Sequence, residues 1–274
     1  MDYIKATYKK PESDVDSEIL IAFLAEAGFE SFENTENGVV AYIPAGDFSE
    51  DLLPSGYGKA DIELIEDQNW NAVWESNYEP VLIGDSVFIR APFHEHNPAA
   101  NYEIVINPKM AFGTAHHETT ALMIEYLLEL KSQMKDKTLL DMGCGTGVLA
   151  ILASMEGAGK ITAIDNDTWS VESTEENTKE NNTPNVKAVL GDASLLPEKE
   201  TFDIILANIN KNILLNDMPA YVKSLKKGGQ ILFSGFYEDD LNDIIEKAGV
   251  LGMEFVDFKT KNSWVSARFS KTAE

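Results

Sequence analysis

From residue 119 to the end of the chain, helical and extended patterns follow one another in a regular order. Apolar runs of strand length cover 138–141, 160–165, 186–190, 202–207, 230–233, 254–261 and 264–269. Helical patterns cover 119–134, 148–156, 169–181, 214–225 and 241–248. Because parallel strands need a crossover connection, this alternation predicts an α/β fold with helices on both faces of a sheet. The last two runs add an antiparallel hairpin, so we expect a doubly wound, mostly parallel sheet of seven strands.

The residues before this region predict a separate, smaller unit. Strand patterns at 3–8, 39–43 and 61–65 accompany a helical pattern at 17–28, so we expect residues 1–66 to form a small α+β domain. Trp70 and Trp74 lie four residues apart and predict a linker helix over 67–82 that carries both rings on one face. Short strand patterns at 87–91 and 103–106 then open a larger domain over 83–274.

The charge and the cysteine count limit the possible partners and compartments. The chain carries 46 acidic and 22 basic residues, a formal net charge of −24. Such a field repels nucleic acid, which is recognised by basic patches, and attracts cationic partners. No apolar run approaches the roughly 20 residues of a membrane span. The single cysteine, Cys144, excludes an intrachain disulfide. We therefore expect a cytoplasmic protein that binds neither membrane nor nucleic acid directly.

The most informative local motif joins the strand at 138–141 to the helix at 148–156. It holds Gly143, Gly145 and Gly147 at alternate positions. Glycines let the backbone turn tightly and let a ligand approach it, and the start of the helix offers free N–H groups. This combination predicts a nucleotide-type site at the carboxyl end of a first strand.

The residues around this loop favour S-adenosylmethionine over a dinucleotide. A dinucleotide fingerprint needs G-x-G-x-x-G or G-x-G-x-x-A, and only the frame from Gly145 to Ala150 satisfies it. Asp141, where the strand ends, would repel a pyrophosphate and attract a cationic amine. S-adenosylmethionine carries such an amine and a sulfonium, and it has no phosphate.

Polar residues also end the next three predicted strands. Asp165 can accept from both ribose hydroxyls, as the corresponding acid does in NAD sites. Asp192 can accept from the adenine amino group, and Asn208 follows the fourth strand. Because the carboxyl ends of parallel strands line one crevice, we expect these residues and Gly145 to contact the cofactor together.

The glycine loop and the polar strand ends resemble the class I S-adenosylmethionine-dependent methyltransferases, which have a Rossmann-like sheet. A narrower resemblance lies in the stretch AFGTAHHETT at 111–120, which is similar to a motif of the ribosomal protein L11 methyltransferases. The resemblance implies that residues 1–66 recognise the substrate. It also implies cofactor contacts at Thr120, Gly143, Asp165 and Asn208.

The same resemblance implies a reaction. Methyl groups would pass from S-adenosylmethionine to lysine side chains and the N-terminal amine of a basic protein of the large ribosomal subunit. Asn208 is assigned the catalytic role of holding the amine or the cofactor's amino group through its side-chain oxygen. Ala115 stands where the family commonly has glycine, and Asn210-Lys211 where smaller residues are frequent. We therefore expect local differences around the acceptor mouth.

Two other functions stay open at this point. The Gly145 frame allows an NAD-type oxidoreductase, and the same fold could serve as a non-catalytic module that binds S-adenosylmethionine and accompanies a basic protein. Cys144 lacks a partnered base, so we expect it, like Trp264, to be a packing residue. The sequence does not indicate an oligomeric state.

The histidines do not predict a metal centre. No carboxylate or cysteine cluster stands beside them at the spacing that metal ligands need. The histidines concerned are His94, His96, His116 and His117. We expect the last two to shape the loop over the cofactor.

Overall fold

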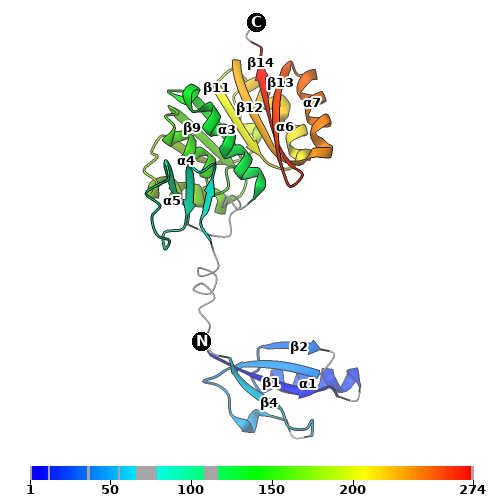
Figure 1. Ribbon diagram of the computed structural model, residues 1–274. Coiled ribbons are helices and arrows are strands. Elements are labelled where there is room, and N and C mark those ends of the chain that lie inside the picture. The colour runs from blue at the N-terminus through cyan, green and yellow to red at the C-terminus, as the bar shows by residue number, and fades with distance from the viewer. Residues whose placement is uncertain are drawn as a thin grey trace. The chain divides into compact units, whose positions relative to one another are not determined.

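Hydrophobic side chains gather into separate cores, which divide the chain into two units, Met1–Asn77 and Tyr78–Glu274 (Figure 1). The computed structural model describes residues 2–11, 13–35, 38–54, 56–65, 79–107 and 117–272. Most of the predicted linker helix over 67–82, with both of its tryptophans, lies outside the described residues. The predicted C-terminal end of this linker helix is wrong, because Val81–Ile83 form strand β5. Within the described residues, no helix is long and apolar enough to cross a membrane.

The first unit is an antiparallel sheet in the order β2-β3-β1-β4, with one helix packed on it. Its strands are β1 (Tyr3–Lys9), β2 (Ser31–Thr35), β3 (Gly38–Pro44) and β4 (Asp61–Ile65). Helix α1 (Asp14–Glu26) begins at Ser13, whose side chain accepts a hydrogen bond from the Asp16 N–H. Side chains alternate between the faces of a strand, so one sheet face and α1 share a core. This core includes Ala6, Tyr8, Leu20, Leu24, Val39, Ala41 and Ile43.

The second unit contains a seven-stranded sheet in the order β10-β9-β8-β11-β12-β14-β13 (Figure 1). Its parallel strands are β8 (Thr138–Met142), β9 (Lys160–Asp165), β10 (Val186–Leu190), β11 (Phe202–Asn208) and β12 (Leu225–Tyr237). At one edge, β14 (Trp264–Lys271) runs antiparallel to both β12 and β13 (Met253–Lys261). The predicted doubly wound, mostly parallel sheet is confirmed. The strand order reverses between β8 and β11, where open α/β sheets bind their ligands.

Two cores lie on opposite faces of this sheet, because neighbouring residues of one strand enter different cores. Leu139 belongs to the core that contains α3 and α4, and Leu140 to the core that contains α6 and α7. The helices are α3 (Glu118–Met134), α4 (Val148–Met155), α5 (Thr168–Glu180), α6 (Lys211–Ser224) and α7 (Leu241–Val250). Helix α5 packs beside β9 and β10.

Three differences from the expected elements have local causes. Strand β2 was not predicted, because Phe32 is its only large apolar residue and no alternation marks it. Strand β5 was missed because it has only three residues. Helix α6 begins at Lys211 rather than Leu214, because the Asn210 side chain caps it by accepting from the Ile213 N–H.

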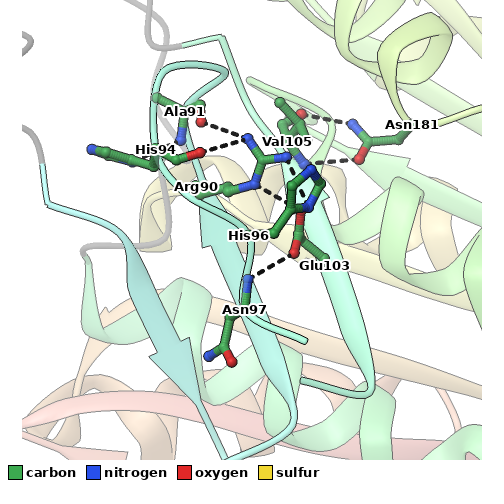
Figure 2. Close-up of polar contacts among 8 residues, drawn as sticks. All are labelled: Arg90, Ala91, His94, His96, Asn97, Glu103, Val105 and Asn181. Atoms are coloured by element: carbon green, nitrogen blue, oxygen red, sulfur yellow. Dashed lines mark hydrogen bonds and ion pairs between the residues drawn. The ribbon is translucent and has the colours of Figure 1, made fainter. Parts of the chain in front are cut away.

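A small three-stranded sheet of β5, β6 (Val87–Arg90) and β7 (Tyr102–Val105) carries a part-buried ion pair (Figure 2). Arg90 Nε donates to Glu103 Oε1 at 2.7 Å, and Arg90 Nη1 donates to the Ala91 carbonyl at 3.0 Å. Burial would raise the pKa of Glu103, but the hydrogen bonds from Arg90 and the Asn97 N–H outweigh it and lower that pKa. The pair therefore fixes the loop after β6 onto β7.

Asn181, at the end of α5, joins this small sheet to the rest of the unit (Figure 2). Its Oδ1 accepts from the Val105 N–H at 2.8 Å, and its Nδ2 donates to the Val105 carbonyl at 2.6 Å. The Asn181 amide thus pairs with both backbone groups of Val105 at the edge of β7, as a neighbouring strand would. Because α5 also contacts the glycine loop, the small sheet and the loop share one support.

We expect Arg90→Met to lower the free energy of unfolding of the second unit by about 3 kcal/mol, because it leaves a part-buried Glu103 carboxylate without its main partner. Urea unfolding at pH 7, followed by circular dichroism, measures the change. Lys223→Met is the matched control. Its partner Glu198 is mostly exposed, so the free energy of unfolding of this variant should fall by less than about 1 kcal/mol. Equal losses in the two variants would contradict this argument.

Candidate active site

The glycine loop joins β8 to α4 through a turn that requires glycine at two positions at least. Gly143 and Gly147 have φ values of 72° and 78°. A Cβ on Gly143 would lie 2.3 Å from Ile209 Cγ2, and one on Gly147 would lie 2.9 Å from Thr174 Cγ2. A larger residue would therefore strain the backbone and collide with its neighbours.

Side chains from β9 and α5 fix the backbone of this loop. Asp165 Oδ2 accepts from the Gly145 N–H at 2.9 Å. The Thr174 hydroxyl donates to the Gly145 carbonyl at 2.9 Å, and the Asn177 amide donates to the Thr146 carbonyl at 2.9 Å. Thr174 and Asn177 are both buried, and neither was predicted from sequence. The sequence held one signal for them: Thr174 and Asn177 are uncharged polar residues on a helix that is otherwise rich in glutamate.

A crevice of about 390 Å³ opens at the carboxyl ends of the central strands. Four predicted site residues line it: Gly143, Gly145, Asp165 and Asn208. Asp192 lines an adjoining recess of about 70 Å³, which shares Gly143 and Asp165 with the crevice. The other lining residues of the crevice are His117, Thr119, Asn166, Ser170, Ile209, Asn210, Ile213, Gly235 and Trp264. A larger depression of about 840 Å³ lies along α5 and β10. None of the described residues that line it was predicted to belong to the functional site.

The two predicted acids at strand ends are ordered by backbone N–H groups. Besides its bond from Gly145, Asp165 accepts from the Asp167 N–H at 3.0 Å. Each carboxylate oxygen has more than one acceptor position, so capacity is left for ribose hydroxyls. Asp192 precedes the short 3₁₀ helix η2 (Ala193–Leu195) and accepts from the Ser194 N–H at 2.8 Å. This contact with Ser194 lowers the pKa of Asp192, which keeps the carboxylate ionised as an acceptor.

Asn208 ends β11 in the wall of the crevice. Its Nδ2 donates to Thr120 Oγ1 at 3.4 Å, while its Oδ1 is buried without a hydrogen-bond partner among the described residues. Leaving a buried acceptor unpaired costs about 1–3 kcal/mol, so this atom is suited to accept from a ligand. Thr120 is 1% exposed and contacts Asn208. Among the described residues, Thr119 lines the crevice and Thr120 does not. A direct contact between Thr120 and the cofactor stays a prediction.

Trp264, which we expected in the core, is half-buried and lines the crevice. Its ring centroid lies 4.0 Å from that of Tyr237 and 4.6 Å from that of His117, the latter nearly edge-on at 69°. His117 is the N-cap of α3, and its Nδ1 accepts from the Thr119 N–H. Three rings thus pack together, and two of them, Trp264 and His117, line the crevice. Aromatic faces attract cations, so this group favours an amine-containing ligand.

Asp141, which we expected to attract a cationic amine, is 1% exposed at the end of β8. Its Oδ2 has no partner within the described part of the chain. Burial raises the pKa of Asp141 to about 7, although a hydrogen bond from the Ala150 N–H acts in the opposite direction. A positive charge in the crevice would favour the ionised carboxylate and lower this pKa.

Cys144 lies in the glycine loop and is buried. Its Sγ lies 3.4 Å from Thr174 Oγ1, whose hydrogen is donated to the Gly145 carbonyl. Burial raises the pKa of the thiol well above its ordinary value, so the thiolate that a nucleophile needs is disfavoured. The predicted packing role agrees with this position.

The histidines of the small sheet belong to the Arg90 cluster (Figure 2). His94 Nδ1 accepts from the Ala91 N–H at 3.1 Å, and His96 Nδ1 lies 2.7 Å from Glu103 Oε1. The described residues contain no group of three or more His, Cys, Asp or Glu side chains that could hold a metal ion. His116 lies outside the described residues.

The strand order, the glycine loop and the acids around one crevice define a class I S-adenosylmethionine-dependent methyltransferase. The family model of the ribosomal protein L11 methyltransferases (PrmA) matches residues 7–272, and the chain belongs to this family. This membership confirms the predicted fold, cofactor and enzyme class, and it decides against the NAD-type oxidoreductase.

Named relatives resemble the chain over most of its length. The ribosomal protein L11 methyltransferase of Phocaeicola vulgatus is 45% identical over 280 residues, which cover 98% of this chain and 99% of that protein. The one from Chlorobaculum tepidum is 34% identical over 277 residues, 93% of each chain. The crystal structure of ribosomal protein L11 methylase from Lactobacillus delbrueckii subsp. bulgaricus is similar with a TM-score of 0.65 and 26% identity, and the match covers 71% of this chain and 100% of that one.

We expect Asp165→Asn to weaken S-adenosylmethionine binding by about tenfold to a hundredfold and to leave folding largely intact. The variant loses charged hydrogen bonds worth about 1.5–3 kcal/mol, but its amide oxygen can still accept from the Gly145 N–H. Calorimetric titration measures the affinity and thermal melting the fold. Asp167→Asn, at the N-cap of α5, is the control and should bind normally. An unchanged affinity in the Asp165 variant would refute the ribose assignment.

We also expect S-adenosylmethionine binding to release a proton near pH 7. In the free protein burial favours the protonated form of Asp141, and a bound cation lowers the pKa of this carboxyl, so a proton leaves. Titration calorimetry in two buffers of different ionisation enthalpy measures the number released. Asp141→Asn should abolish the release, whereas Glu156→Gln, which removes a second carboxyl with a pKa raised by burial to about 7, should not. Proton uptake in the unaltered protein would contradict the assignment.

Proposed function

We propose that this protein transfers methyl groups from S-adenosylmethionine to ribosomal protein L11, on lysine side chains and on the N-terminal amine. The substrate is the one in the names of the relatives described above. The observation that carries the proposal is Asn208 Oδ1, a buried acceptor in the crevice wall with no partner among the described residues. An amine is a donor that this atom can hold.

The residues of the crevice have a limited task in this reaction. When bound, S-adenosylmethionine supplies a methyl group that its sulfonium has already activated. The chain must hold an amine in line with the methyl–sulfur bond. Asn208 Oδ1 accepts from the amine, and the contact of its Nδ2 with Thr120 keeps the oxygen turned to the ligand. Trp264 borders the same space, and its ring face attracts a positively charged product.

The acceptor amine must lose a proton before the transfer, because free lysine titrates at about pH 10.4. Desolvation in the crevice and a neighbouring positive charge both lower the pKa of an amine. Asp165 is the one carboxylate among the described residues that line the crevice, and its oxygens already accept two backbone N–H groups. We therefore assign the proton to bulk water rather than to a dedicated side-chain base.

The first unit is assigned to substrate recognition because of its charge and its open sheet face. The first 65 residues include 14 acidic and 4 basic side chains. On the face opposite α1, strand pairing places Ser31, Tyr42, Lys5 and Glu63 in one row and Glu33, Val40, Thr7 and Asp61 in the next. The hydroxyl of Tyr42 donates to Glu33 at 3.3 Å. An acidic face with tyrosines suits a basic protein surface and disfavours nucleic acid.

The proposed substrate also implies where in the cell the reaction takes place. Because the substrate is a ribosomal protein, we place the reaction in the cytoplasm. Mass spectrometry of ribosomal protein L11 after incubation with the protein and S-adenosylmethionine tests the activity directly. We expect mass increments of whole methyl groups on L11 and none on another basic ribosomal protein. Bound cofactor with unmodified L11 would point instead to a non-catalytic module.

Asn208→Ala should slow the methylation of L11 by about tenfold to a hundredfold, because a hydrogen bond that orients the acceptor is worth about 1.5–3 kcal/mol. Its affinity for S-adenosylhomocysteine should change by only about twofold. Asn216→Ala, which truncates an exposed amide on α6, is the control and should retain the rate. A parallel fall of rate and cofactor affinity would make Asn208 a cofactor-binding residue and not an acceptor-holding one.

Neutralising the open face of the first unit should raise the KM for L11 by about tenfold and leave kcat unchanged, since charges on an interface rim act mainly on encounter. It should also flatten the salt dependence of association. The variant combines Glu33→Gln, Asp61→Asn and Glu63→Gln. A control with the same change in charge, on exposed positions of α1 and the 3₁₀ helix η1 (Glu50–Leu52), combines Glu18→Gln, Glu26→Gln and Asp51→Asn. Equal effects in both would show that net charge, and not this face, guides the substrate.

A further inference from the structure

The segment after Asn208 holds the two residues at which the sequence departs from the pattern of the resemblance, Asn210 and Lys211. We expected this difference to alter the acceptor mouth. The two side chains differ in their placement. Asn210 lines the crevice and caps α6, whereas Lys211 is not among the described residues that line the crevice. Lys211 therefore does not narrow the mouth, and its ammonium reaches another part of the second unit.

The Lys211 ammonium forms ion pairs with the segment that follows β12. Its Nζ donates to Asp240 Oδ1 at 2.7 Å and lies 2.6 Å from Asp243 Oδ2. Asp240 ends the 3₁₀ helix η3 (Glu238–Asp240), and Asp243 lies in the first turn of α7. The side chains of Lys211 and Asp240 are both 27% exposed, so water and salt screen this pair only in part. We call Lys211, Asp240 and Asp243 the lysine clamp, which joins the start of α6 to η3 and α7.

The lysine clamp is connected to the aromatic rings beside the crevice. The second carboxylate oxygen of Asp240, Oδ2, accepts from the Tyr237 N–H at 3.3 Å. The Tyr237 ring packs on that of Trp264, which lines the crevice, with 4.0 Å between the centroids. Because the Tyr237 side chain is half exposed, core packing holds it only in part. The position of this ring pair therefore depends on the turn that Asp240 stabilises.

The backbone of the same two segments is in close contact. The Ile209 N–H donates to the Ser234 carbonyl at 3.1 Å, and Gly235 has a φ value of 95°. A Cβ on Gly235 would lie 2.3 Å from the Ile209 carbonyl oxygen, so only glycine lets the segments approach this closely. Gly235, Ile209 and Asn208 all line the crevice. The segment that carries Asn208 and the end of β12 are thus joined by this backbone contact and by the lysine clamp.

We propose that Lys211 is a positioning residue for methyl transfer, because the lysine clamp fixes the ring pair beside the crevice relative to Asn208. This inference rests on the proposed function, in which Asn208 holds the acceptor amine, and extends it to residues outside the crevice. Both carboxylates of the clamp lie within hydrogen-bond distance of one nitrogen. Without the ammonium between them they would repel each other, so η3 would move and Tyr237 would move with it.

Steady-state methylation of ribosomal protein L11 by the full chain tests this role. Lys211→Met removes the charge and should lower kcat by about tenfold to a hundredfold, because the transfer depends on alignment. The KM for L11 should not change, because recognition is assigned to the first unit, and the affinity for S-adenosylhomocysteine should not change either. Lys211→Arg keeps a cation between the carboxylates and should retain most of the rate. Lys223→Met, which breaks an exposed ion pair in the last turn of α6, is the control and should retain kcat.

Fluorine NMR of the cofactor-free protein separates positioning from stability alone. Fluorinated tryptophan gives a resonance for each of the 4 tryptophans, and Trp264→Phe identifies the one from Trp264. Lys211→Met should shift the Trp264 resonance, because the packing of Tyr237 on this ring changes. The resonance of Trp169, an exposed residue on the first turn of α5, is the internal control and should not move. Asp243→Asn, which leaves the Asp240 pair in place, should give a smaller shift in the same direction.

A normal kcat in Lys211→Met would overturn the proposal, even if the variant unfolds at a lower urea concentration, because the clamp would then only stabilise the fold. A lower kcat with an unmoved Trp264 resonance would overturn it as well, since the rings would not carry the effect. Equal losses of kcat and of cofactor affinity would assign the clamp to cofactor binding instead. If the unaltered protein bound S-adenosylhomocysteine and left L11 unmodified, the proposed function itself would be refuted.

Discussion

The turn from Gly143 to Gly147 is the constraint on which the second unit depends. The N–H groups of Gly143 and Cys144 both donate to the Ile164 carbonyl, at 2.8 and 3.2 Å, which ties the loop to the end of β9. Thr174 holds the loop from α5. Since β8 lies beside the central strand β11, this single turn decides where the ends of these strands and the start of α4 meet. A residue with a Cβ at Gly143 would collide with Ile209, and one at Gly147 would collide with Thr174, so the loop would have to move.

Two of the unpaired buried polar atoms of this unit lie near the carboxyl ends of its central strands. Most buried polar side chains around the loop are satisfied by protein, as Asn177 is by the Thr146 carbonyl. The atoms without partners in the described residues include Asp141 Oδ2 and Asn208 Oδ1 near strand ends, and also both carboxylate oxygens of Glu156 at the end of α4. A folded protein tolerates such groups where a ligand satisfies them. Asn208 Oδ1, in the wall of the crevice, is placed to be satisfied in this way.

In the proposed function, the first unit contributes charge and the second contributes geometry. The first unit has an acidic open sheet face and a small core, which favours association with a basic partner over wide distances. The second unit has two cores on either side of its sheet, and these hold the crevice residues in fixed positions. Methyl transfer needs alignment more than acid–base chemistry, so a rigid crevice with few charges is sufficient for it.

The sequence by itself determined most of the elements, though not β2 or β5, and the residues at strand ends, because hydrophobic periodicity and turn residues are local properties. It located Gly143, Gly145, Asp165, Asp192 and Asn208 for that reason, and the structure brings them to one crevice and its adjoining recess. Only the tertiary structure decided which distant side chains meet there. The sequence predicted Trp264 as a core residue, but strand pairing sets it opposite Tyr237, and the start of α3 brings His117 against its ring at the crevice. Such contacts depend on how whole elements pack across the sheet, and no local pattern carries that information.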